Sequence, residues 1–98
     1  MEHMRYSADW MVLADDRILE YIREMDSGGA TKMANSGYVR YSRQYISQRL
    51  NKLADKGFLR HLGNGVYVLT DRGEAYLEGD LDAETLEEPE NGFGRAQS

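Results

Sequence analysis

The sequence predicts one small α+β domain, mostly α, in which three helices precede a two-stranded β-hairpin and a fourth helix follows. Apolar residues recur at helical spacing in the first half of the chain, and two short β-type runs flank a Gly-Asn-Gly turn in the second half. A chain of 98 residues suffices for a single core. We expect one domain over residues 1–86 and a disordered acidic tail over residues 87–98, which hold the only proline.

The first helix is predicted over residues 14–25. Ile18, Ile22 and Met25 recur at the spacing of one buried stripe, and acidic residues near the start suit the positive end of the helix dipole. We expect Gly28-Gly29 to end this helix.

A short second helix is predicted over residues 31–36. Thr31 is its candidate N-cap, and Gly37 is placed to end it. Eight residues separate Ala34 from Ser42, more than in the tight turn of the common helix-turn-helix. The sequence therefore leaves the angle of the next helix open.

The third helix, over residues 42–56, is the clearest element of the chain. Ser42 suits the N-cap, and Gly57 is placed to be the left-handed residue that ends the helix. Its inward stripe consists of Ile46, Leu50 and Leu53. At about 100° per residue, the opposite side carries Gln44, Gln48 and Asn51.

A β-hairpin is predicted from residues 58–62 and 66–70, because Asn and Gly between them accept the positive φ of a tight turn. A three-residue loop, Gly63-Asn64-Gly65, sets Leu59 opposite Leu69. Thr70 or Asp71 then caps a last helix over residues 72–78, which could continue to Leu81 or Leu86. Three helices, a hairpin that forms a wing and a final helix are the layout of a winged helix-turn-helix domain.

Charge is unevenly distributed along the chain, whose net charge is −5. Residues 32–61, the cationic segment, hold seven basic residues against Asp55 alone. Residues 1–31 and 62–98 are acidic, with net charges of −4 and −7. This asymmetry indicates a polyanionic partner, although chance clustering on a solvated face stays open.

Residues 42–52 contain no acid, unlike the first and last helices. Their polar side chains suit base edges in the major groove of double-stranded DNA: Arg binds guanine, Gln or Asn binds adenine, and Ser binds either. The candidate base-reading residues, which would hydrogen-bond base edges, are Ser42, Arg43, Gln44, Ser47, Gln48 and Asn51. The candidate contacts to the DNA backbone are Lys32, Arg40, Lys52, Arg60 and Asn64. For Arg49, an internal ion pair and a DNA contact are both open, and for Asn64 a plain tight turn is the alternative. A plain solvent-exposed role is the alternative for Arg43, Gln44, Gln48 and Asn51.

Enzymatic chemistry is not expected. The chain has no cysteine for thiolate chemistry or zinc ligation, and His3 and His61 lie near no second ligand. Asp15 and Asp16 are adjacent on a helix, so their carboxylates diverge by about 100°. There is no glycine-rich phosphate loop. We expect no cofactor, metal, membrane segment or small-molecule ligand, and a cytoplasmic location.

Ser42-Arg-Gln-Tyr-Ile-Ser-Gln-Arg-Leu-Asn-Lys-Leu-Ala-Asp-Lys-Gly-Phe-Leu59 resembles the recognition helix and first wing strand of archaeal and bacterial winged-helix transcription regulators. Val66-Tyr-Val-Leu-Thr-Asp-Arg-Gly73 resembles their second wing strand and final helix start. Three further stretches, Ser7–Met11, Asp15–Tyr21 and Gly63–Tyr67, resemble phage-repressor-like winged-helix proteins of halophilic archaea. Together the resemblance covers residues 5–82. Acids outnumber bases, and arginine outnumbers lysine nine to three, which fits a salt-adapted source.

The resemblance implies a repressor that binds DNA as a homodimer on a two-fold operator. By matching position it implies base reading by Ser42, Arg43, Gln44, Ser47 and Gln48. A protein-interaction module without specific DNA binding stays open, as does a ligand-sensing regulator, for which so small a domain leaves little room. Candidate dimer surfaces, each of which could equally be core, are Tyr6, Trp10 and Met11, and Tyr76, Leu77 and Leu81.

Overall fold

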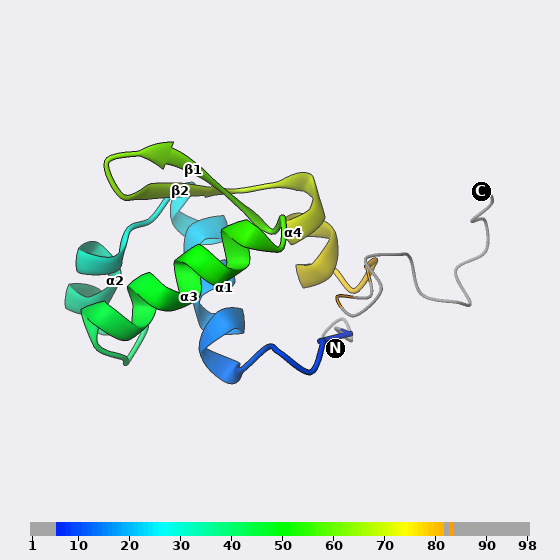
Figure 1. The fold of residues 1–98 in the computed structure, drawn as a ribbon, viewed down its shortest axis with the longest axis horizontal. Helices are drawn as coiled ribbons and strands as arrows, with labels where there is room; N and C mark the ends of the chain where they lie inside the picture. The colour runs from blue at the N-terminus through cyan, green and yellow to red at the C-terminus, as the bar shows by residue number, and fades with distance from the viewer. Residues whose placement is uncertain (1–5, 82, 84–98) are drawn as a thin grey trace.

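The computed structural model describes residues 6–81 and residue 83. Its elements follow the order α1 (Leu13–Met25), α2 (Ala30–Ser36), α3 (Arg43–Asp55), β1 (Leu59–Gly63), β2 (Val66–Leu69) and α4 (Asp71–Leu77). The hairpin β1–β2 runs alongside α3, with α2 near its tip and α4 at its base (Figure 1). The predicted winged helix-turn-helix fold is confirmed. The tail expected over residues 87–98 lies outside the described residues.

The residues that end α1 and cap α2 differ from the prediction, although α1 ends at Met25 as expected. Helix α1 ends at Met25 because Asp26 takes a left-handed φ of 73°, which aspartate tolerates better than most residues. Gly28-Gly29 is therefore not the stop. Gly29 is instead the N-cap of α2, so Thr31 lies inside the first turn of that helix and does not cap it.

Helix α3 forms as predicted. The Ser42 hydroxyl oxygen accepts a hydrogen bond from the Tyr45 amide at 3.1 Å, and Gly57 follows the helix with a φ of 90°. Its inward residues, Ile46, Leu50 and Leu53, are buried. The connection from α2 is fixed by Val39, which is 1% exposed and belongs to the core.

The wing keeps the predicted pairing of Leu59 with Leu69, but its turn is tighter than expected. Gly63 pairs with Val66, and the irregularity in the register falls between His61 and Gly63. The turn itself is Asn64-Gly65, with φ values of 55° and 76°. Two successive positive φ angles are those of a two-residue hairpin turn whose twist matches the strands, which explains why the chain places an extra residue in β1 instead of a third in the loop.

Helix α4 closes the core. Thr70 is its N-cap, since the Thr70 hydroxyl oxygen accepts from the Gly73 amide at 3.1 Å. Tyr76 is fully buried and stacks on Phe58 with ring centroids 5.6 Å apart, and Leu77 and Leu81 are also buried. The apolar side of α4 therefore packs inside the monomer and is not a free surface for dimerisation.

Candidate nucleic-acid interface

The outward side of α3 is polar and accessible. Of the six candidate base-reading residues, Ser47 is half-buried and the other five are exposed. Across the helix, Ile46, Leu50 and Leu53 face the core. Within residues 6–81 and 83, no acidic side chain forms an ion pair with this outward side. One side of α3 is therefore a solvent-accessible surface of neutral polar and cationic side chains.

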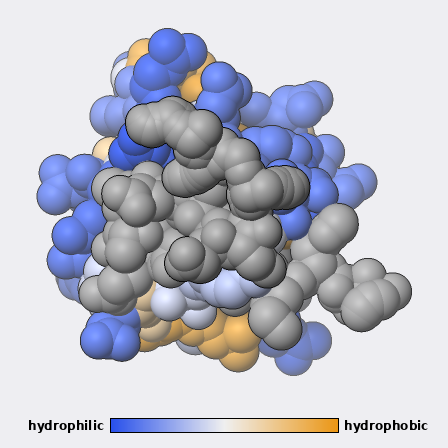
Figure 2. All heavy atoms as spheres, turned by 90° about the vertical axis from the view of Figure 1, so that its right-hand side faces the viewer, coloured by the Kyte–Doolittle hydropathy of each residue, from blue (hydrophilic) through white to orange (hydrophobic). Residues whose placement is uncertain are grey.

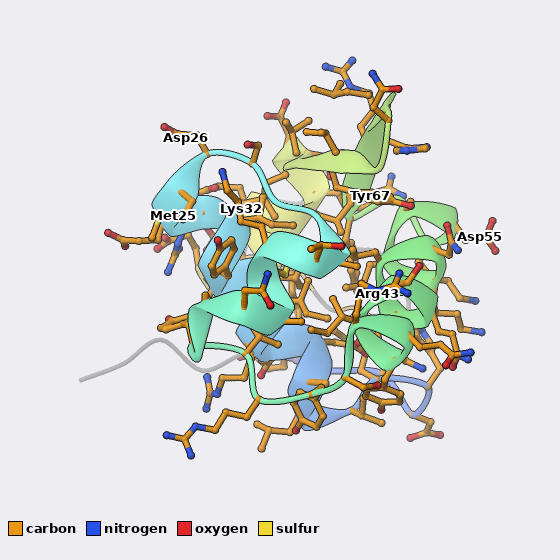
Figure 3. The ribbon with its side chains drawn as sticks, turned by 90° about the vertical axis from the view of Figure 1, so that its left-hand side faces the viewer. Met25, Asp26, Lys32, Arg43, Asp55 and Tyr67 are labelled. Carbon is orange, nitrogen blue, oxygen red and sulfur yellow. The ribbon has the colours of Figure 1, made fainter. Side chains whose placement is uncertain are left out.

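A hollow of about 390 Å³ lies between α3 and the tip of the wing. Its polar lining includes four of the nominated residues, from three parts of the chain: Lys32 on α2, Arg43 and Ser47 on α3, and Asn64 in the wing turn. Figure 3 looks at this side of the molecule, with Lys32, Arg43 and Tyr67 on the three elements that border the hollow. The structure thus brings together four residues that the sequence nominated separately.

The other nominated residues lie outside the hollow. Gln44, Gln48 and Asn51 lie further around α3, Arg40 is in the exposed connection from α2, and Lys52 is half-buried on α3. Arg60 is exposed on β1.

Arg49 belongs to the interior. Its Nε donates to Asp15 Oδ1 at 2.8 Å, and its Nη2 donates to Asp15 Oδ2 at 2.7 Å and to the Trp10 carbonyl at 3.0 Å. The hydrogen bond that Arg49 donates to Asp15 raises the pKa of Arg49 against the lowering effect of burial. Of the two roles that the sequence left open for Arg49, the internal ion pair is the one observed.

Lys56 is also used inside the domain, since its Nζ lies 5.4 Å from the centre of the Trp10 ring. Five basic residues of the cationic segment remain. In the part of the chain that the structure describes, none of them forms an ion pair: Lys32, Arg40, Arg43, Lys52 and Arg60.

Tyr67 ties the wing to α3, a role that the sequence did not suggest. Its hydroxyl donates to Asn51 Oδ1 at 3.0 Å. The alternation of β2 could have identified it, because Tyr67 shares the inward face with Leu69, and a buried tyrosine hydroxyl needs a hydrogen-bond partner.

Apolar exposure is scattered over the surface. Figure 2 shows a mostly hydrophilic face around the grey atoms, with an apolar area along its lower edge. In the described part of the chain, the exposed large apolar side chains are Val12, Leu13, Met25, Tyr38, Tyr41, Leu62 and Val66. Among the described residues, no helix has the length and apolar character to cross a membrane, and no group of three or more potential ligands could hold a metal ion.

The fold and the polar, partly cationic outward side of α3 define a DNA-binding domain of the winged helix-turn-helix class. The chain belongs to the winged helix-turn-helix phage repressor family, whose model matches residues 4–89. It is therefore a DNA-binding regulator of the repressor type and not a member of an enzyme family.

Two relatives have nearly the same length as the chain. It is 37% identical over 92 residues to the repressor protein of Halobacterium phage phiH, a match that covers 86% of this chain and 98% of that protein. The crystal structure of the PhiH1 repressor-like protein from Haloarcula marismortui matches with a TM-score of 0.85 at 45% identity, covering 88% of this chain and 98% of the other.

Proposed function

We propose that the protein is a sequence-specific repressor that places α3 in the major groove of its operator. The observation that carries this proposal is the outward side of α3 over residues 42–52, which is largely exposed, contains no acid and lies opposite a fully buried apolar stripe. Major-groove edges are distinguished by hydrogen-bond donors and acceptors, which Arg43, Gln44 and Gln48 supply. Ser42, Ser47 and Asn51 complete the base-reading set.

In this arrangement, one DNA strand lies with its sugar-phosphate backbone across the hollow. Lys32 and Asn64 line it from opposite elements, so a strand lying across the hollow meets both. Arg40, Lys52 and Arg60 add cations outside the hollow. Such contacts fix the register of the protein on the duplex and carry no sequence information themselves.

The proposal is tested with Arg43→Ala and Gln48→Ala on an operator selected from a random DNA pool. Each is expected to weaken operator binding about tenfold to a hundredfold, because a well-formed base contact is worth about 1–3 kcal/mol. Affinity for random DNA should change far less. Fluorescence anisotropy on both DNAs measures the two losses.

The matched control is Arg72→Ala, which removes an exposed arginine on α4, outside the cationic segment. It should leave both affinities nearly unchanged. Equal losses of Arg43→Ala on operator and random DNA would show that Arg43 contacts only phosphate. If no genomic fragment bound at micromolar protein at any salt concentration, a protein-interaction function would replace the proposal.

We also propose a homodimer, because a single domain of this size contacts few base pairs and two-fold pairing doubles the site. The core uses the apolar side of α4, whereas Val12 and Leu13 at the start of α1 are 42% and 61% exposed and follow the half-buried Met11. Sedimentation equilibrium should give twice the mass of one chain. A mass equal to one chain, both free and on a half-operator, would contradict the dimer.

A further inference from the structure

The hydrogen bond between the wing and α3 has a consequence for which bases are read. We propose that Tyr67 is a positioning residue that orients the amide of Asn51, so that its Nδ2 group faces the DNA as a hydrogen-bond donor. The inference rests on the proposed function, since it assigns a base preference to one of the residues on the outward side of α3. Its geometric basis is the 3.0 Å bond from the Tyr67 hydroxyl to Asn51 Oδ1.

Tyr67 is held from several sides. Its backbone pairs with His61 of β1 on one side and with Gly28 on the other. The bonds to Gly28 are 3.0 Å from the Gly28 amide to the Tyr67 carbonyl and 2.8 Å from the Tyr67 amide to the Gly28 carbonyl. The ring stacks on His61 with centroids 4.5 Å apart, and the residue is only 6% exposed. The hydroxyl therefore has a fixed position above α3.

The turn between α1 and α2 supports this position through two glycines. A Cβ at Gly28 would lie 2.6 Å from Met33 Cε, and a Cβ at Gly29 would lie 2.7 Å from the Gly65 carbonyl oxygen. Gly29 thus allows the turn to approach the wing backbone closely, and Gly28 leaves room for the side chains of α1 and α2 while its own backbone pairs with Tyr67. Gly28-Gly29 therefore serves to hold the wing, and with it Tyr67, against the helices.

The chemistry follows from the two ends of an amide. Oδ1 accepts and Nδ2 donates, and the two ends have nearly the same shape, so an untethered Asn51 could turn its amide over. The Tyr67 hydroxyl donates to Oδ1, and turning the amide over would leave the proton of this buried hydroxyl without the acceptor that the structure gives it, so one orientation is favoured. In the major groove, Nδ2 then meets an acceptor favourably (purine N7, guanine O6 or thymine O4) and a donor such as the cytosine N4 amino group unfavourably.

Tyr67→Phe tests the inference, because it keeps the stacked ring and removes only the hydroxyl. The affinities of wild type and variant are measured on the operator and on all of its single base-pair substitutions. At one position of the operator, the ratio of affinities for an acceptor base over a donor base should be about threefold to tenfold smaller in the variant than in the wild type. This is the size expected for one net hydrogen bond. Preferences at the other positions, and affinity for random DNA, should stay the same.

Asn51→Asp gives a second arm on an exposed residue, for which folding is not in question. A carboxylate still accepts from Tyr67 but offers the DNA no donor, so the preference at the same position should shift towards cytosine, whose N4 amino group donates. Asn51→Ala should abolish the preference, and adding Tyr67→Phe to it should change nothing further, as expected for residues that act through one contact.

Two outcomes would overturn the inference. One is an unchanged base preference in Tyr67→Phe and Asn51→Asp; the other is a uniform loss on operator and random DNA, which would make Asn51 a phosphate contact. Both leave the proposed function standing, because the wild type still discriminates between sequences. If the wild type bound every sequence equally, the proposed function itself would fail.

Discussion

Asp15→Ala is expected to lower the free energy of unfolding by about 3–5 kcal/mol, because it leaves the guanidinium of Arg49 unpaired in a largely buried position. Asp15 is 0% exposed and Arg49 is 17% exposed at its side chain. The Asp15 carboxylate accepts both bonds from Arg49 and a third from the Val12 amide at 3.1 Å. The substitution therefore also removes a bond at the start of α1.

Thermal unfolding followed by circular dichroism measures this loss. In a domain of this size each kcal/mol lowers Tm by about 4–8 °C, so the melting temperature should fall by more than about 10 °C. Arg17→Ala is the control, since it breaks a partly exposed pair with Glu20 within one helix and should cost less than about 1 kcal/mol. Equal effects of the two variants would contradict the assignment of Arg49 to the interior.

A double variant separates the value of the pair from the cost of breaking it. Asp15→Leu together with Arg49→Met replaces both charges by apolar side chains, and such replacements of a buried pair are often neutral. The double variant should therefore be more stable than Asp15→Ala. A double variant that is less stable than Asp15→Ala would show that the ion pair itself stabilises the domain.

The Arg49 guanidinium should stay charged up to strongly alkaline pH, and the pair should respond little to salt. Since hydrogen bonding to Asp15 raises the pKa of Arg49, the stabilising contribution of the charged guanidinium is complete below the ordinary arginine pKa and declines only at strongly alkaline pH above it. Burial also limits screening by salt. The interaction ties α3 to α1 and to the Trp10 carbonyl, so it holds α3 at a fixed angle on the domain.

Local features of the sequence predicted the main elements. Ser42 and Gly57 define α3 by its cap and its left-handed end, which depend only on neighbouring residues. The wing pairing of Leu59 with Leu69 followed from the turn residues. The burial of Ile46, Leu50 and Leu53 followed from helical periodicity, and the exposure of the opposite side followed with it.

Contacts between distant segments could not be predicted in this way. The partner of Arg49 lies 34 residues away along the chain, so the sequence could not distinguish an internal ion pair from a DNA contact. Gly28-Gly29 looked like a helix stop because its close approach to the wing is a tertiary contact. The bond between Tyr67 and Asn51 depends on how the wing folds back over α3.

The affinity for DNA is expected to fall steeply with salt, although the chain carries a net charge of −5. Each phosphate contact adds about 0.9 to the slope of log affinity against log salt. Four cations outside the base-reading set are available for phosphate: Lys32, Arg40, Lys52 and Arg60. A tenfold rise in salt should then weaken binding by roughly a thousandfold to ten-thousandfold per domain.

Single variants separate phosphate contacts from the general field of the protein. Lys32→Gln and Arg60→Gln should each flatten the slope by about 0.9 without changing the base preference. Lys56→Gln is the matched control, because Lys56 lies over Trp10 and is expected to contribute no phosphate contact. A flattening by Lys56→Gln as large as that by Lys32→Gln would assign the salt dependence to the overall charge of the segment.

The ratio of operator affinity to random-DNA affinity should change much less with salt than either affinity. Hydrogen bonds from Gln44, Ser47 and Gln48 release no counterions, so salt weakens them only slightly, whereas phosphate contacts weaken equally on both DNAs. At about 1 M salt the Debye length is near 3 Å, and the acidic remainder of the chain no longer repels DNA over distance. If the ratio instead collapsed as salt rose, sequence discrimination would depend on Arg43 and the other charges, not on the neutral side chains of α3.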